Sequence, residues 1–124
     1  MSRKKEYFKH ELPTSVVVVV YAICADYDRR EREMKFGIVS GDVLEHYAEL
    51  NRTIESALLC VESDLREDLL SDIAKKRGFE RSRISPLLSK NAYYRRRRRV
   101  IYEIAAGLKL CEGEDEEKIF SSDD

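Results

Sequence analysis

Hydrophobic residues recur along the first half of the chain at alternating steps of four and three, the spacing of one face of an α-helix. The first stripe consists of Val16, Val20, Ile23, Tyr27, Arg30 and Met34. The β-branched run at residues 16–20 favours a strand by propensity, but the wider spacing predicts a helix over residues 15–35.

A second stripe follows a loop at residues 37–41 and consists of Val43, Tyr47, Leu50, Ile54, Ala57 and Val61. Two stripes of similar length joined by a short loop predict an antiparallel helical hairpin over residues 15–62. The same stripes are also compatible with a homodimer in which the helices pair between chains.

The second half of the chain predicts a further helical unit over residues 63–110. Ser63 or Asp64 caps a helix with an apolar face at residues 65–74, and Gly78 is a stop signal. A basic connector at residues 79–88 precedes Ser89, which caps a last helix over residues 90–110. Residues 1–14 read as a flexible leader and residues 111–124 as a disordered acidic tail. The predicted fold class is therefore all-α.

Composition supports this class and limits the cellular setting. The 124 residues include only five Gly and two Pro, too few for the turns of an all-β fold, and 43% are hydrophobic, enough for a core. The three cysteines lie far apart and form no C-x-x-C pair, so a reducing cytoplasm is expected. The longest apolar run, residues 16–25, is about half of a membrane span and is followed by charges, so no membrane partner is expected.

The net charge of -1 hides two blocks of opposite sign. Residues 75–99 contain eleven cations and one carboxylate, whereas residues 112–124 contain seven carboxylates and one cation. No Asp or Glu lies between Arg81 and Val100, so the cations there repel one another without compensation. Binding of a polyanion explains this block better than an ordinary solvated face.

A helical wheel divides the arginine run of the last helix. The core-facing side comprises Tyr94, Ile101, Ile104, Ala105 and Leu108, and Arg97 falls in its middle. Because a desolvated guanidinium cannot stay unpaired, we assign Arg97 a structural role and expect it to pair with a carboxylate, Asp68 or Asp72. The role of Tyr93 remains open: the side chain could pack in the core or stack on a base.

The opposite side of the helix is the predicted nucleic-acid-binding face, with Asn91, Arg95, Arg96 and Arg99 suited to the major groove and Arg98 at its border. Ser89 and Lys90 at the helix start, and Arg81 and Arg83 in the connector, are expected to hold phosphates. Duplex DNA is the expected partner. The alternatives are an RNA-binding arginine-rich helix, and an adaptor whose first helices recruit a protein such as RNA polymerase.

No constellation of residues predicts catalysis, a cofactor or a metal site. His10 and His46 have no partner at ligand spacing. Asp26, Asp28, Glu31 and Glu33 alternate with Arg29, Arg30 and Arg32, which predicts surface ion pairs. We therefore do not expect an enzyme.

Residues 89–110, SKNAYYRRRRRVIYEIAAGLKL, resemble the last helix of small phage and mobile-element regulators of the RinA and ArpU type, which are similar to sigma-factor region 4. The shared features are the opening Ser, the Tyr before the arginine cluster and the hydrophobic Ile-Ala ending. Ile73 and Ala74 match the first helix of their helix-turn-helix. The resemblance implies a helix-turn-helix-like unit and a transcriptional regulator of phage or mobile-element genes, with a small terminase subunit as a neighbouring alternative.

Overall fold

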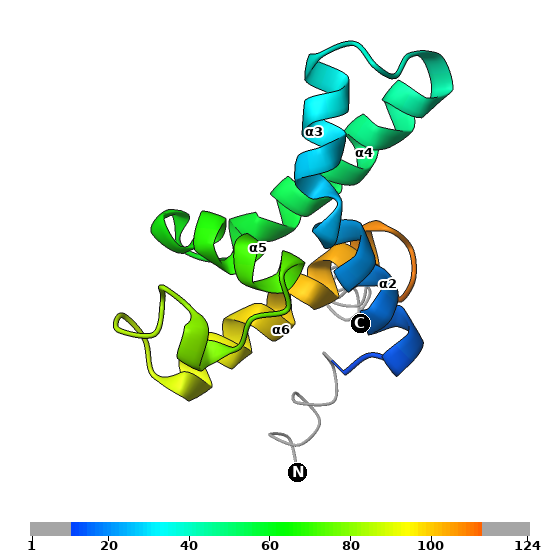
Figure 1. Cartoon of the computed structure of the whole chain (residues 1–124). Helices are drawn as coiled ribbons and strands as arrows, with labels where there is room; N and C mark the ends of the chain where they lie inside the picture. The colour runs from blue at the N-terminus through cyan, green and yellow to red at the C-terminus, as the bar shows by residue number, and fades with distance from the viewer. Residues whose placement is uncertain (1–10, 113–124) are drawn as a thin grey trace.

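The computed structural model describes residues 11–112, which form helices joined by turns (Figure 1). The α-helices are α2 (Thr14–Ala25), α3 (Tyr27–Lys35), α4 (Gly41–Ala57), α5 (Arg66–Ala74) and α6 (Lys90–Gly107). Short 3₁₀-helices span Leu58–Cys60, Ser63–Leu65 and Phe79–Arg81. Residues 11–112 contain no strand, so the predicted all-α class is confirmed. Most of the predicted leader and acidic tail, residues 1–10 and 113–124, lies outside the described residues.

The predicted single helix over residues 15–35 is divided at Asp26. Asp26 has φ of -96° and ψ of 6°, and its carbonyl accepts a hydrogen bond of 3.0 Å from the Arg30 amide. The division lets the two helices run in different directions: α2 packs against α5 and α6, whereas α3 packs against α4 (Figure 1). The β-branched run is helical because Val20 and Cys24, one turn apart, are both fully buried in the core.

The helices α3 and α4 form the predicted hairpin, and a buried polar pair lies between them. The Arg30 side chain donates from Nε to Asn51 Oδ1 (2.6 Å) and from Nη2 to the carbonyl of Ile23 (2.6 Å). Asn51 donates in turn to Glu31 Oε2 at 2.8 Å. The prediction that Arg30 takes part in surface ion pairs is wrong, because its place in the helical stripe turns it inward, where it is buried.

The neighbouring Arg29 does form the predicted surface pairs. Its guanidinium lies 3.0 Å from Asp26 Oδ2 and 3.3 Å from Glu33 Oε2. At the far end of the hairpin the apolar stripe is left uncovered, since Val43 and Leu44 of α4 are exposed beside the loop residues Phe36 and Ile38. The hairpin projects away from the other helices, so only its base joins the core (Figure 1).

The predicted break in helical phase near residues 62–64 is confirmed, although α4 already ends at Ala57. Val61 and Glu62 are extended, with ψ of 164° and 143°. Arg66 stabilises this turn because its Nε donates to the carbonyls of Leu58 (3.0 Å) and Val61 (2.9 Å), at the end of the helical segment.

The core is one cluster, and α6 runs through its centre. Tyr93, Val100, Ile104 and Ala105 of α6 are fully buried, and they share the cluster with residues of α2, α4 and α5. Because α2 packs against α5 and α6, the core is continuous across the predicted boundary between residues 62 and 63.

Candidate nucleic-acid interface

Residues 75–89 connect α5 to α6 and form the first part of the candidate interface. The helix α5 ends in a turn at Lys76, which adopts φ of +57°, while the Arg77 amide donates back to the Asp72 carbonyl at 2.8 Å. A helix-turn-helix joins its two helices by a turn of about three to four residues. The connector is much longer, so α5 and α6 do not form the compact motif that the resemblance implies.

The start of α6 is capped as predicted. Ser89 Oγ accepts a hydrogen bond of 3.2 Å from the Ala92 amide, and Ser89 itself has the extended backbone of an N-cap. Lys90 Nζ lies 3.4 Å from Glu80 Oε2, with both side chains exposed. The ammonium group of Lys90 is therefore partly neutralised by the one carboxylate of the connector.

The outer stripe of α6 contains one arginine that is fully available. Asn91 and Arg95 are exposed, and Arg95 forms no ion pair with any residue between 11 and 112. Arg99, by contrast, donates from Nε to Glu103 Oε2 at 2.8 Å. Arg98 is half-buried, which agrees with its predicted position at the border of the face.

Arg96 is held by a carboxylate that the helical wheel does not reveal. Its Nε and Nη2 donate to the two carboxylate oxygens of Glu62, at 2.9 Å and 2.8 Å. The hydrogen bond from Arg96 is the main reason that the pKa of Glu62 falls to about 2. The arginines of the predicted face therefore differ in how readily they could bind a ligand. Arg95 is open to a ligand, whereas Arg96 and Arg99 would first have to give up their ion pairs with Glu62 and Glu103.

Two connector arginines extend the cationic surface beside the first half of α6. Arg81 and Arg83 are exposed and form no ion pair within the described part of the chain. The 3₁₀-helix that contains Arg81 packs against α6, and the connector runs alongside the first turns of that helix (Figure 1). We call Arg81, Arg83 and Arg95 the open arginines.

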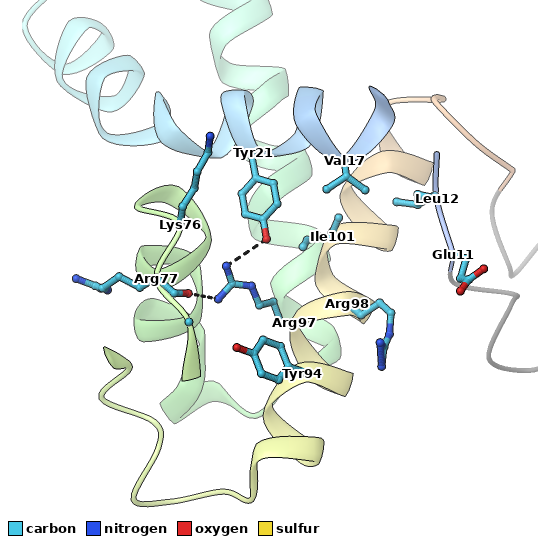
Figure 2. A pocket seen from close by; sticks show the side chains of 11 residues that line it. Glu11, Leu12, Val17, Tyr21, Lys76, Arg77, Tyr94, Arg97, Arg98 and Ile101 are labelled. Carbon is cyan, nitrogen blue, oxygen red and sulfur yellow. Dashed lines mark hydrogen bonds between the residues drawn. The ribbon is translucent and has the colours of Figure 1, made fainter. Parts of the chain in front are cut away.

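Arg97 points inward as predicted, but its predicted partner is wrong. The side chain is 7% exposed and donates to the Arg77 carbonyl and to Tyr21 Oη (3.1 Å) (Figure 2). It also donates to Tyr93 Oη at 2.7 Å. Neither Asp68 nor Asp72 contacts it directly in the described structure. The nearest link to a carboxylate passes through Tyr93, whose hydroxyl donates to Asp72 Oδ2 at 2.8 Å.

The direct ion-pair partner of Asp72 is Arg77, whose Nε lies 3.1 Å from Asp72 Oδ1. The buried carboxylate of Asp72 is thus paired with Arg77 directly and linked to Arg97 only through the hydroxyl of Tyr93. Tyr93 is fully buried, so the open question about its role is answered in favour of the core. Burial first, and the bond to Asp72 second, raise the pKa of Tyr93 to about 12. Tyr94 is only partly buried, and its hydroxyl accepts from the Phe79 amide at 3.1 Å.

Sequence reasoning missed the contacts that join distant segments. Tyr21 lies in α2 and Glu62 follows α4, and neither is near α6 in the sequence. One signal was present: Asp72 lies on the apolar face of its helix, three residues after Leu69 and beside Ile73, a position at which a carboxylate needs an internal partner.

A scan against protein-family models and searches of curated proteins and of solved structures found no match for this chain. Among residues 11–112, no group of three or more His, Cys, Asp or Glu side chains is arranged to hold a metal ion. None of the described helices combines the length and the apolar character needed to cross a membrane.

Proposed function

We propose that this chain binds duplex DNA through the open arginines and the outer stripe of α6, and that it acts as a transcriptional regulator of phage or mobile-element genes. The observation that carries the binding proposal is that Arg81, Arg83 and Arg95 are exposed without an ion pair in the described structure. The regulatory role rests on the resemblance of residues 89–110.

The physical reason is the cost of concentrated like charge. Cations that are exposed and uncompensated repel one another, and binding a polyanion removes that repulsion and releases counterions from it. Arginine suits this role because its planar fork can donate two parallel hydrogen bonds to one phosphate or to a guanine edge.

Within this surface we assign base contacts to Asn91 and Arg95. They are exposed and lie one turn apart on α6, and their side chains suit the adenine edge and the guanine edge in the major groove. Arg81 and Arg83 are assigned to the phosphate backbone. Arg96 and Arg99 contribute only if DNA displaces Glu62 and Glu103 from them.

The test compares two triple variants that remove the same charge. One replaces the open arginines with alanine. The control replaces three exposed cations of α3 and α4 with alanine, namely Arg32, Lys35 and Arg52. Binding of the full chain to a random-sequence duplex is followed by fluorescence anisotropy over a range of salt concentrations.

We expect the open-arginine variant to bind more weakly and to lose about 1.8 units of log–log salt slope, since Arg81 and Arg83 each lose a phosphate contact and each such contact contributes about 0.9. The control should retain the slope of the unmodified chain. Equal effects of the two variants would overturn the assignment of the surface. Duplex RNA or single-stranded oligonucleotides that compete better than duplex DNA would reassign the ligand to RNA or to single strands.

A second candidate is a protein-interaction adaptor, which the exposed apolar end of the hairpin favours. Phe36 and Ile38 are each 68% exposed there. Isolated apolar residues at a surface are common, but a group of them on a projecting hairpin is typical of a contact site. The same titration separates the two functions: a folded chain that binds no duplex at low salt would overturn DNA binding and leave the adaptor.

A further inference from the structure

A pocket of about 610 Å³ lies between α2, the turn after α5 and the middle of α6 (Figure 2). It is separate from the open arginines, none of which lines it. Four cations border it: Lys76 and Arg77 of the turn after α5, and Arg97 and Arg98 of α6; of these, Arg77 is paired with Asp72. Glu11 is the one carboxylate in its described lining.

The buried arginine of this pocket has hydrogen-bonding capacity to spare. A guanidinium carries five N–H donors, and Arg97 uses two on Nη1 and one on Nη2 for its three bonds within the described chain. The Nε–H and the second Nη2–H remain. Nε forms no hydrogen bond within residues 11–112, and since no buried side-chain nitrogen or oxygen there lacks a partner, Nε is not sealed from solvent; Arg97 itself lines the pocket.

The charge of Arg97 also lacks direct compensation. Its three partners are a carbonyl and two phenol hydroxyls, whereas Asp72 is already paired with Arg77. A buried guanidinium that faces a pocket without a carboxylate of its own favours an anionic ligand. Lys76 and Arg98 also border the pocket, on opposite sides of Arg97; Figure 2 shows their charged ends turned away from the Arg97 guanidinium, so each would rotate toward an anion bound there.

The backbone of the turn is held in an unusual shape at the edge of this pocket. Lys76 adopts φ of +57°, which costs a residue with a Cβ about 1 kcal/mol or more and is routine only for glycine. Gly78, also in the lining, lies close to Tyr94, and an added Cβ would come within 3.2 Å of the Tyr94 hydroxyl.

The rest of the lining is apolar. Leu12, Val17 and Ile101 form one side of the pocket, next to the Tyr21 ring (Figure 2). Cations at one part of a pocket and apolar side chains at another suit a ligand that has both an anionic group and an apolar or aromatic body.

We propose that this pocket binds a phosphate monoester with an aromatic or apolar body, with the phosphate at Arg97, Lys76 and Arg98 and the body against Val17 and Ile101. A monoester carries up to two negative charges and three acceptor oxygens, which matches the spare donors of Arg97 and its two cationic neighbours. The site is independent of the proposed DNA surface.

The experiment measures binding of small probes to the full chain by isothermal titration calorimetry and by NMR. The probes are phenyl phosphate, inorganic phosphate, phenol and diphenyl phosphate. We expect phenyl phosphate to bind best, because inorganic phosphate lacks the aromatic body, phenol lacks the charge and the diester has one charge fewer. Phenol equal to phenyl phosphate would overturn the anion site, and tighter binding of the diester would reassign it to a nucleic-acid backbone. Equal affinity for inorganic phosphate and phenyl phosphate would overturn the role of the apolar side.

Two matched glycine variants test the position of the site. Lys76→Gly and Lys109→Gly each remove one exposed lysine from a residue with positive φ, +57° and +63°, so both relieve the same kind of backbone strain. Only Lys76 borders the pocket. We expect K76G to weaken phenyl phosphate binding about 3-fold and K109G to leave it unchanged. Equal affinities would overturn the assignment.

A third variant blocks the pocket without altering its cations. Val17→Glu places a carboxylate at a half-buried position in the lining, and we expect at least about a 10-fold loss of phenyl phosphate binding from like-charge repulsion. Circular dichroism establishes that the variant is folded. Retained binding by a folded V17E chain would overturn the site, whereas loss of DNA binding in the open-arginine variant has no bearing on it.

Discussion

Replacing Tyr93 with phenylalanine tests the buried network that positions Arg97. The hydroxyl of Tyr93 accepts from Arg97 Nη1 at 2.7 Å and donates to Asp72 Oδ2 at 2.8 Å, and the ring is fully buried. A hydrogen bond to a charged group is worth about 1.5–3 kcal/mol. Both charged partners keep other bonds, so we expect a loss of about 2–4 kcal/mol in the free energy of unfolding, or roughly 10–20 °C in Tm.

The adjacent residue supplies a matched control. Tyr94→Phe removes the same oxygen atom one position along α6, but within the described residues this hydroxyl takes part in one hydrogen bond, which it accepts from the uncharged Phe79 amide at 3.1 Å. We expect a loss of about 1 kcal/mol, typical of a neutral hydrogen bond. Urea denaturation followed by circular dichroism measures both values. A Y93F chain within about 0.5 kcal/mol of Y94F would refute the view that the hydroxyl of Tyr93 joins two buried charges.

The same substitution alters the dependence of stability on alkaline pH. The pKa of Tyr93 is raised from 10.0 to about 12 in the folded chain, by burial and by the bond to Asp72. Its contribution to stability is therefore complete below pH 10 and is lost as pH rises towards 12, because the unfolded chain ionises first. Between these values Y93F should lose less stability than the unmodified chain, and equal losses would contradict the assignment.

Two further substitutions address α6 and its surface. Gly107→Ala should destabilise the chain, although alanine favours a helix more than glycine does, because the new Cβ would lie 2.7 Å from Thr53 Cγ2. Thr53→Ser removes that methyl group, so thermal melts of the double variant should show the stabilisation of about 1 kcal/mol that alanine brings to a helix. A G107A chain more stable than the unmodified one would contradict the close helix contact. Glu62→Gln should free Arg96 to bind a phosphate and should steepen the log–log salt slope of DNA binding by about 0.9. The control Glu67→Gln, at an exposed residue, should leave the slope unchanged. Equal slopes for the two variants would contradict a phosphate contact by the released Arg96.

The all-α class, the hairpin and the inward position of Arg97 could all be predicted from the sequence. Each follows from periodicity, because a period of 3.6 residues fixes which side chains share a face before any neighbour is known. The cap at Ser89 is equally local, since its hydroxyl bonds an amide three residues later. The concentration of cations in residues 75–99 is likewise a property of the sequence alone.

Which arginines lack an ion pair depends on contacts between segments that are distant in the sequence. Arg95 and Arg96 are neighbours in one run of arginines, yet Arg96 meets Glu62 because the turn after α4 brings that carboxylate beside α6. Arg97 likewise meets Tyr21 of α2, from a segment 76 residues away in the chain. Such partners depend on how helices cross rather than on the period within one helix, and the wheel of α6 alone carries no information about them.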